Sequence, residues 1–298
     1  MKQEIFGLSL TELQIRLAEM GLKRFRAKQI FSWLYRKCVF DFSAMTNLSL
    51  AERDTLAEYF SILPGEIICL RQLDSADGLT QKLLLQLLDG NTIETVLMHH
   101  DYGYSVCVSS QVGCDMHCAF CASGLNGAVR NLTQIEILAQ VYFFNARLAA
   151  AGQRVSRVVV MGSGEPMLNF DNVFGALQFL HLPETANMSY RNMTVSTCGI
   201  IPGIERMQQL AAPINLAISL HAVQDELRTA LMPVNRGYPF PAVIAAAEDY
   251  ALHSGRQVTY EYILLDGKND REEDALLLAE FLRHKKASVN VIPVNPIP

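Results

Sequence analysis

The stretch that decides the fold reads CVSSQVGCDMHCAFC, from Cys107 to Cys121, and it contains four of the seven cysteines. Three of them, Cys114, Cys118 and Cys121, have the spacing Cys-x3-Cys-x2-Cys, which lets one loop direct three thiolates at one soft metal centre. A cubane iron–sulfur cluster is usually bound by four cysteines, so three leave one iron open to a substrate or cofactor. Structural zinc normally has four protein ligands, and no second pair of cysteines follows at close spacing. The spacing therefore favours a cluster over zinc or chance.

The composition is that of a chain that can bury a sizeable core. Of its 298 residues, 50% are hydrophobic and 18% charged, with a formal net charge of −5, enough for one large domain plus a small one. No apolar run reaches the roughly 18 residues of a membrane span, and the start, MKQEIFGLSLTELQ, lacks the apolar core of a signal peptide. Seven cysteines, odd in number and clustered, argue for a reducing compartment. We therefore expect a cytoplasmic protein with no membrane partner.

The first forty residues are basic within an acidic chain. They hold eight Lys and Arg against three acidic residues, and no acid occurs from Gly21 to Val39. Leu10, Leu13 and Leu17 are spaced for one face of a helix, and a second helix is expected to pack on it. A basic helical domain over residues 1–64 is the plain interpretation. Its basic face either contacts RNA phosphates or is simply solvated, and the residues alone leave both open.

A change of period follows this helical part. Helix is expected to continue through residues 41–64 until Pro64-Gly65 ends it. Beyond it, QKLLLQLL, then Asp89-Gly90, then NTIETVLM predict a hairpin with a type I′ turn. Residues 65–104 are thus interpreted as a β-hairpin connector to the main domain at 105–298.

Strands and helices alternate in that main domain, which predicts an α/β fold of parallel βαβ units. Thr133-x-x-Glu136 is a capping box that opens the first helix. Six units are too few for an eight-stranded barrel, and sites on such folds lie at the carboxyl ends of the strands. We place the six strands near Ser105–Ser109, Arg157–Met161, Met193–Ser196, Ile214–Leu220, Gln257–Leu264 and Ser288–Ile292.

The cysteine motif and its surroundings resemble one family. Cys-x3-Cys-x-Phe-Cys resembles the signature of radical S-adenosylmethionine (SAM) enzymes. CVSSQVGC, GAVRNLT, VVMGSGEPMLNFDNV, VSTCGIIPGI, LAISLHA, ELRTALMPVNR and VIPVNP resemble the RlmN-type RNA adenine methyltransferases, with the Cfr-type methyltransferases close behind. The resemblance covers essentially the whole chain. It implies a radical SAM partial (β/α)6 barrel with a small N-terminal helical domain that helps hold RNA.

The resemblance also implies cofactors and site residues. The cofactors are a [4Fe–4S] cluster on Cys114, Cys118 and Cys121, and SAM. Glu94 matches the proton acceptor and Cys107 matches a cysteine that resolves the covalent RNA intermediate. Without the resemblance, Glu94 would be a solvent-facing strand residue and His221 a structural histidine. The SAM pocket matches Phe120, Gly164, Glu165, Ser196, Ser219, Leu220, His221 and Asn295.

The implied reaction is methylation of carbon 2 of adenosine in 23S ribosomal RNA and transfer RNA. In the family, SAM methylates a cysteine in a C-terminal segment and also yields the radical that activates this methyl group. No cysteine follows Cys198, so the chain is expected to be truncated before the methyl-carrying cysteine, and to release 5′-deoxyadenosine without methylating RNA. A flavodoxin-like electron donor and a monomeric state are the further expectations.

Three alternatives stay open at this point. A Cfr-type enzyme would act at carbon 8, although Val112 and Pro166 argue against it. A radical SAM activase would act on a protein, which the basic N-terminal residues disfavour. A cluster-bearing RNA-binding protein would transfer no methyl group at all.

Overall fold

The structure is a computed structural model and describes residues 2–210 and 212–294. The chain divides into two compact units. Unit 1 comprises residues 1–108, 132–158 and 171–189, and unit 2 comprises residues 109–131, 159–170 and 190–298. Within the described ranges, no helix is both long and apolar enough to cross a bilayer. Asn295, expected in the SAM pocket, lies outside the described residues.

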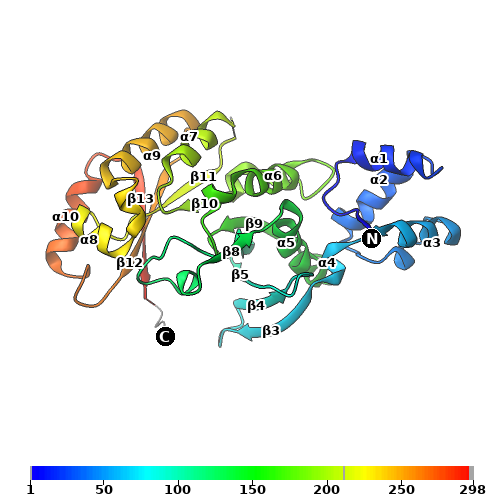
Figure 1. The fold of residues 1–298 in the computed structure, drawn as a ribbon, viewed down its shortest axis with the longest axis horizontal. Coiled ribbons are helices and arrows are strands. Elements are labelled where there is room, and N and C mark those ends of the chain that lie inside the picture. Colours follow the sequence, from blue (N-terminus) through cyan, green and yellow to red (C-terminus); the bar gives the residue numbers. More distant parts are fainter. Residues whose placement is uncertain (1, 211, 295–298) are drawn as a thin grey trace. The chain divides into compact units, whose positions relative to one another are not determined.

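Unit 1 opens with helices (Figure 1), two of which begin at a capping serine. The side chains of Ser9 and Ser49 each accept a hydrogen bond from the backbone amide three residues on. The carboxylates of Glu12 and Glu52 accept the amides of these two serines in turn, so two N–H groups at each helix start are satisfied. The helical elements up to residue 66 are α1 Leu10–Glu19, α2 Arg26–Phe31, the π-helical η1 Ser32–Arg36, the 3-10 turn η2 Phe42–Ala44, α3 Leu50–Tyr59 and α4 Leu63–Glu66.

The expected end of the third helix at Pro64-Gly65 is wrong. Helix α3 ends at Tyr59, because Phe60–Ser61 (β2) leaves the helix to pair in parallel with Gln3–Glu4 (β1). Pro64 instead lies in the first turn of the short α4, where a missing N–H costs no helical hydrogen bond. Strand pairing with a segment more than fifty residues away thus overrides the local signal.

The N-terminal helices share a core with two later helices, α5 Gln134–Ala149 and α6 Phe170–His181. The ring of Tyr35 lies 5.2 Å from Phe6, 5.4 Å from Tyr142 and 5.2 Å from Phe179. Helix α5 begins at the predicted Thr133–Glu136 capping box, so that prediction is confirmed. The domain boundary at residue 64 stays a prediction.

The sheet of unit 1 is a meander rather than a single hairpin. Its strands are adjacent in the order β3, β4, β5, β6, β9, and β3 to β6 pair antiparallel. The first four residues of β9 belong to this unit. The strands are β3 Ile68–Asp74, β4 Thr80–Gln86, β5 Thr92–His100, β6 Gly103–Val108 and β9 Val155–Val160.

The β4–β5 hairpin is confirmed, but its type I′ turn is wrong. Of Asp89 and Gly90, only Gly90 has a positive φ, at 85°, whereas a type I′ turn needs both. The amide of Gly90 bonds the carbonyl of Leu87, and the amide of Leu87 bonds the carbonyl of Asn91. This is a type I turn followed by a left-handed glycine, the usual longer alternative.

Unit 2 contains four parallel strands with helices between them (Figure 1), as the alternation predicted. They are adjacent in the order β10, β11, β12, β13. Cross-strand register places Ser219 beside Glu261, and Glu261 beside Asn290. The strands are β10 Met193–Thr197, β11 Asn215–Ser219, β12 Val258–Leu264 and β13 Ala287–Pro293; the helices are α7 Ile201–Gln209, α8 Asp225–Leu231, α9 Phe240–Ser254 and α10 Glu272–Leu282.

Candidate active site

The cysteine loop is built on a short hairpin of unit 2. Strand β7 (Gln111–Gly113) pairs antiparallel with β8 (Ala128–Asn131), and the three cysteines lie between them. At Gly113, φ is 78° and an added Cβ would lie 1.9 Å from the carbonyl oxygen of Gly127, so only glycine allows this hairpin. The amide of Cys114 bonds the same carbonyl at 3.2 Å. The backbone therefore holds the loop closed around its cysteines.

One pocket of unit 2, the strand-end pocket, collects most of the predicted site. It is lined by side chains that follow or end several strands, as expected for the carboxyl ends of parallel strands. Cys114 is buried, whereas Cys118 and Cys121 are half-buried. The predicted residues that line it are Cys114, Cys118, Phe120, Cys121, Gly164, Glu165, Ser196, Ser219 and His221.

Glu165 is the most enclosed carboxylate of this pocket. Its Oε1 accepts the amide of Met167 at 3.0 Å and its Oε2 accepts the amide of Cys198 at 2.8 Å. Its own amide donates to Oε1 of Gln111 at 2.8 Å. Burial raises the pKa of Glu165, while the bonds from the amides oppose this shift. The carboxylate thus joins the GSGEP loop to the segment after β10.

Gly164 allows the close approach on which this arrangement depends. Its φ is 104°, and an added Cβ would lie 2.7 Å from the backbone nitrogen of Gln111. A side chain here would push the GSGEP loop away from the segment that leads to the cysteines. Close packing against Gln111 therefore explains why residue 164 is glycine, whether or not a ligand is bound.

His221 is held as a neutral ring in a strained backbone conformation, with φ at 58°. Its Nδ1 accepts the amide of Ile263 at 3.0 Å, so the ring proton resides on Nε2. Burial, together with the nearby Arg228 cation, lowers the pKa of His221 to about 3. Phe120 meets this ring edge-on, at 4.6 Å between centroids. The histidine is therefore a fixed hydrogen-bond donor at the strand-end pocket.

Two predicted residues lie in unit 1 instead. Glu94 is on β5, with its carboxylate 2.7 Å from Nζ of Lys82 and its side chain 54% exposed. Cys107 is half-buried on β6 and pairs in register with Val96. Because side chains two apart on a strand share a face, Glu94 and Cys107 lie on one face of this sheet as diagonal neighbours.

Leu220 is a predicted SAM residue that the strand-end pocket does not expose. It is fully buried, and its carbonyl accepts Nε of Arg228 at 3.3 Å. Leu220 therefore contributes a buried side chain just after β11 and a carbonyl that bonds Arg228.

Sequence reasoning missed Arg228, a fully buried cation within the quoted motif ELRTALMPVNR. Its Nη2 donates to the carbonyls of Cys198 at 2.8 Å and Ser219 at 3.2 Å, and its Nη1 donates to Oδ1 of Asn235. Burial lowers the pKa of this guanidinium. A basic residue in a polar helix is ordinarily expected at the surface, so its pattern carried no signal.

Glu261 and Asn290 were missed as well. Glu261 is buried on β12, lines the strand-end pocket and accepts Nδ2 of Asn290 at 2.7 Å. A single carboxylate in the apolar run VTYEYILL was the available signal.

The donor set suits the predicted cofactors. Burial raises the pKa of Cys114 and, with the neighbouring thiols, raises that of Cys118 to about 12; a bound metal centre reverses this, because coordinated thiols lose their protons. Within the described ranges, no group of three His, Cys, Asp or Glu side chains converges on a single metal ion. A cubane cluster does not require this, because each of its cysteines binds a different iron. Three soft thiols from one loop, beside a pocket with Glu165 and a donor histidine, fit a cluster with an adjacent SAM.

Two family models match this chain, one over most of unit 2 and one over the N-terminal helices. The family model of the Radical SAM superfamily matches residues 108–279. The model of the ribosomal RNA large subunit methyltransferase N-terminal domain matches residues 3–62.

Two curated relatives and one solved structure are similar over the chain. A probable dual-specificity RNA methyltransferase RlmN of Symbiobacterium thermophilum is 48% identical, over 99% of this chain and 79% of its own length. The protein of the same name from Spiroplasma citri is 46% identical, over 98% of this chain and 84% of its own. The crystal structure of a radical SAM methyltransferase from Sphaerobacter thermophilus is 43% identical, covering 99% of this chain and 86% of that one, with a TM-score of 0.94.

The chain belongs to the RlmN family of radical SAM RNA methyltransferases. It is therefore a transferase, and its cofactors are a [4Fe–4S] cluster and SAM. The predictions of fold class, enzyme class and cofactors are confirmed.

Proposed function

We propose that this protein methylates carbon 2 of adenosine in 23S ribosomal RNA and in transfer RNA. The observation that carries the proposal is the strand-end pocket, where the cysteine loop, the GSGEP loop and the ends of β10 and β11 meet. The relatives named dual-specificity RNA methyltransferases support an RNA substrate of two kinds. When bound, the cluster and SAM supply the methyl group and the radical chemistry that an unactivated ring carbon requires.

The residues of unit 2 bind and shield these groups. Cys114, Cys118 and Cys121 hold the cluster and leave one iron open. The GSGEP loop, with Glu165 fixed by two amides, receives the amino group of SAM. His221 donates from Nε2, because its other nitrogen is occupied by a backbone amide.

The residues of unit 1 complete methyl transfer. We assign Glu94 as the group that accepts the proton from the adenine ring. We assign Cys107 as the thiol that forms a disulfide with the methyl-carrying cysteine, while the bond between that cysteine's sulfur and the RNA-bound methylene carbon breaks and the methylated RNA is released. Their positions as diagonal neighbours on one sheet face support a shared step. The Lys82 ammonium holds the Glu94 carboxylate in place without burying it.

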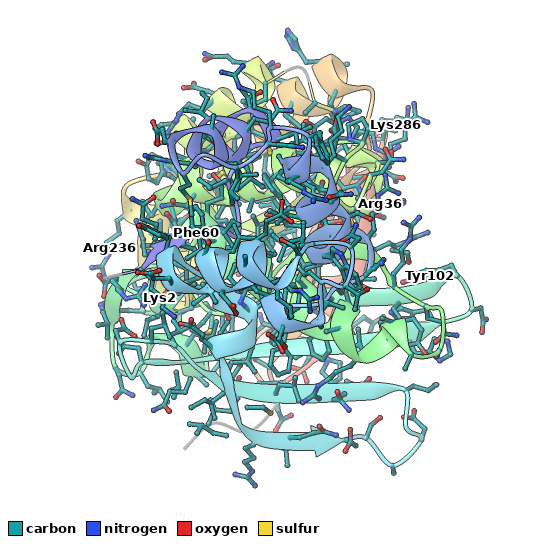
Figure 2. All side chains as sticks on the ribbon, turned by 90° about the vertical axis from the view of Figure 1, so that its right-hand side faces the viewer. Lys2, Arg36, Phe60, Tyr102, Arg236 and Lys286 are labelled. Carbon is teal, nitrogen blue, oxygen red and sulfur yellow. The ribbon has the colours of Figure 1, made fainter. Side chains whose placement is uncertain are left out.

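The N-terminal basic run contacts RNA phosphates in this proposal, but its members are not equivalent. Arg26 bonds Oε1 of Glu52 at 2.8 Å. Arg36, whose side chain is labelled in Figure 2, donates to the carbonyl of Pro183. Lys23, Arg24 and Lys28 are exposed and have no ion pair in the described part of the chain. These three are therefore the proposed phosphate ligands.

A flavodoxin-like protein is the proposed electron donor, and the protein is proposed to act as a monomer in the cytoplasm. None of the seven cysteines is paired in a disulfide, which supports a reducing compartment.

The test is anaerobic incubation of the cluster-reconstituted protein with SAM, a reductant and unmodified ribosomal or transfer RNA, both as it stands and with the family's C-terminal segment appended. Nucleoside mass spectrometry should find 5′-deoxyadenosine in both cases, and 2-methyladenosine in both RNAs when the segment with the methyl-carrying cysteine is present. Methylation at carbon 8 would indicate a Cfr-type enzyme instead. Deoxyadenosine with no methylated nucleoside in either RNA, when that segment is present, would contradict the assigned substrate.

A further inference from the structure

Glu261 is a buried carboxylate of the strand-end pocket to which the proposed reaction gives no role. It lies in the middle of β12, and 7% of its surface is exposed. Its neighbours across the sheet are Ser219 on β11 and Asn290 on β13. Burying a carboxylate is costly unless hydrogen bonds compensate for the lost water. Its placement at a ligand pocket therefore calls for a partner.

One half of the Glu261 carboxylate is already occupied. Its Oε2 accepts Nδ2 of Asn290 at 2.7 Å. Its Oε1 has no hydrogen bond within residues 2–210 and 212–294, although the residue lines the pocket. Burial raises the pKa of Glu261, and the bond from Asn290 opposes that shift. An acceptor atom is thus available to a ligand.

The charges nearby do not supply that partner. The Arg228 guanidinium donates its hydrogen bonds to the carbonyls of Cys198 and Ser219 and to Oδ1 of Asn235. His221 is turned with Nδ1 toward the amide of Ile263. Among the described residues, Glu261 has no ion pair.

The position of Glu261 indicates which part of a ligand it meets. Glu165, the carboxylate of the GSGEP loop, bonds the amide that follows β10. Glu261 is on β12, two strands beyond β10, which is about 10 Å at normal strand spacing. An elongated ligand with its amino acid end at the GSGEP loop would present its sugar to β11 and β12. Sugar hydroxyls are donors, and carboxylates are their usual acceptors in nucleotide sites.

We propose that Glu261 binds the ribose hydroxyls of SAM through Oε1, and that Asn290 is the positioning residue that holds the carboxylate. This inference rests on SAM occupying the strand-end pocket, and it adds the contact that distinguishes an intact ribose from a deoxyribose.

A purely structural tie between β12 and β13 is the competing explanation, and the sheet offers a matched control. Thr259 and Ser288 form the register pair two residues before Glu261 and Asn290, with their hydroxyls 3.2 Å apart. They share the same face of the sheet but do not line the pocket. Removing the hydroxyl in Ser288→Ala therefore tests the strand pairing without touching the ligand.

The experiment measures binding rather than turnover. Equilibrium dialysis of the reconstituted protein, without reductant, compares Kd values for SAM, its 2′-deoxy and 3′-deoxy analogues and an analogue without the adenine amino group. We expect the unaltered protein to bind one deoxy analogue at least about tenfold more weakly, since a hydrogen bond to a charged group is removed. Glu261→Gln should bind SAM about tenfold more weakly and discriminate less between the two sugars. In Asn290→Ala the Kd for SAM should rise by a smaller factor. In Ser288→Ala all Kd values should equal those of the unaltered protein.

Two outcomes overturn the inference. If the unaltered protein binds both deoxy analogues as tightly as SAM, no hydroxyl is recognised; that comparison needs no variant and no folding control. The Glu261→Gln variant could still bind the deoxy analogues more weakly than SAM by the same factor as the unaltered protein. Alternatively, it could differ from the unaltered protein only in its Kd for the analogue without the adenine amino group. Either result would show that Glu261 does not contact the ribose. Each of these results leaves RNA methylation intact as a function, because the assay contains no RNA.

Discussion

The strand-end pocket of unit 2 and the sheet face of unit 1 that carries Glu94 and Cys107 are built on opposite principles. In the pocket, Glu165 and His221 have their polar atoms fixed by backbone amides, and the buried Arg228 bonds carbonyls. On the sheet face, Glu94 is 54% exposed and forms an ion pair with Lys82, which is 43% exposed. This difference is what we expect if the pocket binds the cofactors and the exposed sheet face acts on the RNA.

Such a division has a physical reason. Cofactor chemistry needs groups that are pre-oriented and shielded, and their desolvation is compensated by hydrogen bonds within the fold. A group that must accept a proton from a large RNA has to be reachable by it. Variants should therefore separate the two regions, by affecting radical generation in one case and methyl transfer in the other.

The largest effect is expected for the three proposed cluster ligands. Replacing Cys114, Cys118 and Cys121 together by Ala should reduce bound iron and SAM cleavage to background, because no thiolate remains in the loop. Iron and sulfide analysis with deoxyadenosine quantification measures it. Cys69→Ala, on β3 of unit 1, is the matched control and should keep full iron. Stoichiometric iron in the triple variant would place the cluster elsewhere.

Glu94→Gln should abolish methyl transfer to RNA without affecting radical generation from SAM. We expect methylation to fall by about a hundredfold or more, as for the loss of a general base, while deoxyadenosine formation and iron content stay unchanged. The free energy of unfolding should change by less than about 1 kcal/mol, since an exposed ion pair contributes little. Equal loss of both activities would instead assign Glu94 to the cofactor site.

Arg228→Met tests whether the strand-end pocket is rigid because of its buried cation. The change leaves the carbonyls of Cys198 and Ser219 without these donors, which should lower the free energy of unfolding by about 3 kcal/mol. Urea denaturation measures it. Arg283→Met removes an exposed pair with Glu280 in the same unit, and should cost no more than about 1 kcal/mol. Similar values for both variants would show that Arg228 is not a structural centre.

The basic surface of unit 1 should respond to salt. Changing Lys23, Arg24 and Lys28 to Ala should weaken RNA binding and reduce the slope of log K against log salt by about 2 to 3, because each phosphate that is no longer neutralised lowers the slope by close to one. Filter binding at several salt concentrations measures the slope. Arg26→Ala is a poor reporter, because Arg26 bonds Glu52 and its replacement disturbs the helices. An unchanged slope would remove the three residues from the interface.

The smallest effect concerns Glu4, a half-buried acid of unit 1 that lies outside the proposed site. Burial raises the pKa of Glu4 to about 7 from its ordinary value of 4.5. Between these pH values the unfolded chain has released the proton and the native chain keeps it, so the free energy of unfolding falls as pH rises. Glu4→Gln should lack this decline and be about 2 kcal/mol more stable at pH 8, after allowance for partial exposure. Urea denaturation across this pH range measures it, and an equal pH dependence in both proteins would contradict it.

Local patterns were enough for the elements and the cofactors. The spacing of Cys114, Cys118 and Cys121, the Thr133 capping box and the six strands of the βα alternation all depend on neighbours within a few residues. Where distant partners compete, the local signal failed. Helix α3 stops early because Phe60 pairs with Gln3, and the Asp89-Gly90 turn follows the hairpin's loop length rather than its dipeptide.

The sequence by itself determined the family and the positions of the six alternating strands, and it is the basis on which Cys114, Cys118 and Cys121 are proposed as cluster ligands. The tertiary structure decided which polar groups come together around the strand-end pocket. Glu261 meets Asn290, twenty-nine residues later, only through strand register, and Arg228 reaches three carbonyls only once β11 and the segment after β10 end side by side. A buried charge has no local signature, because what makes it tolerable is the set of distant hydrogen-bond partners that folding brings to it.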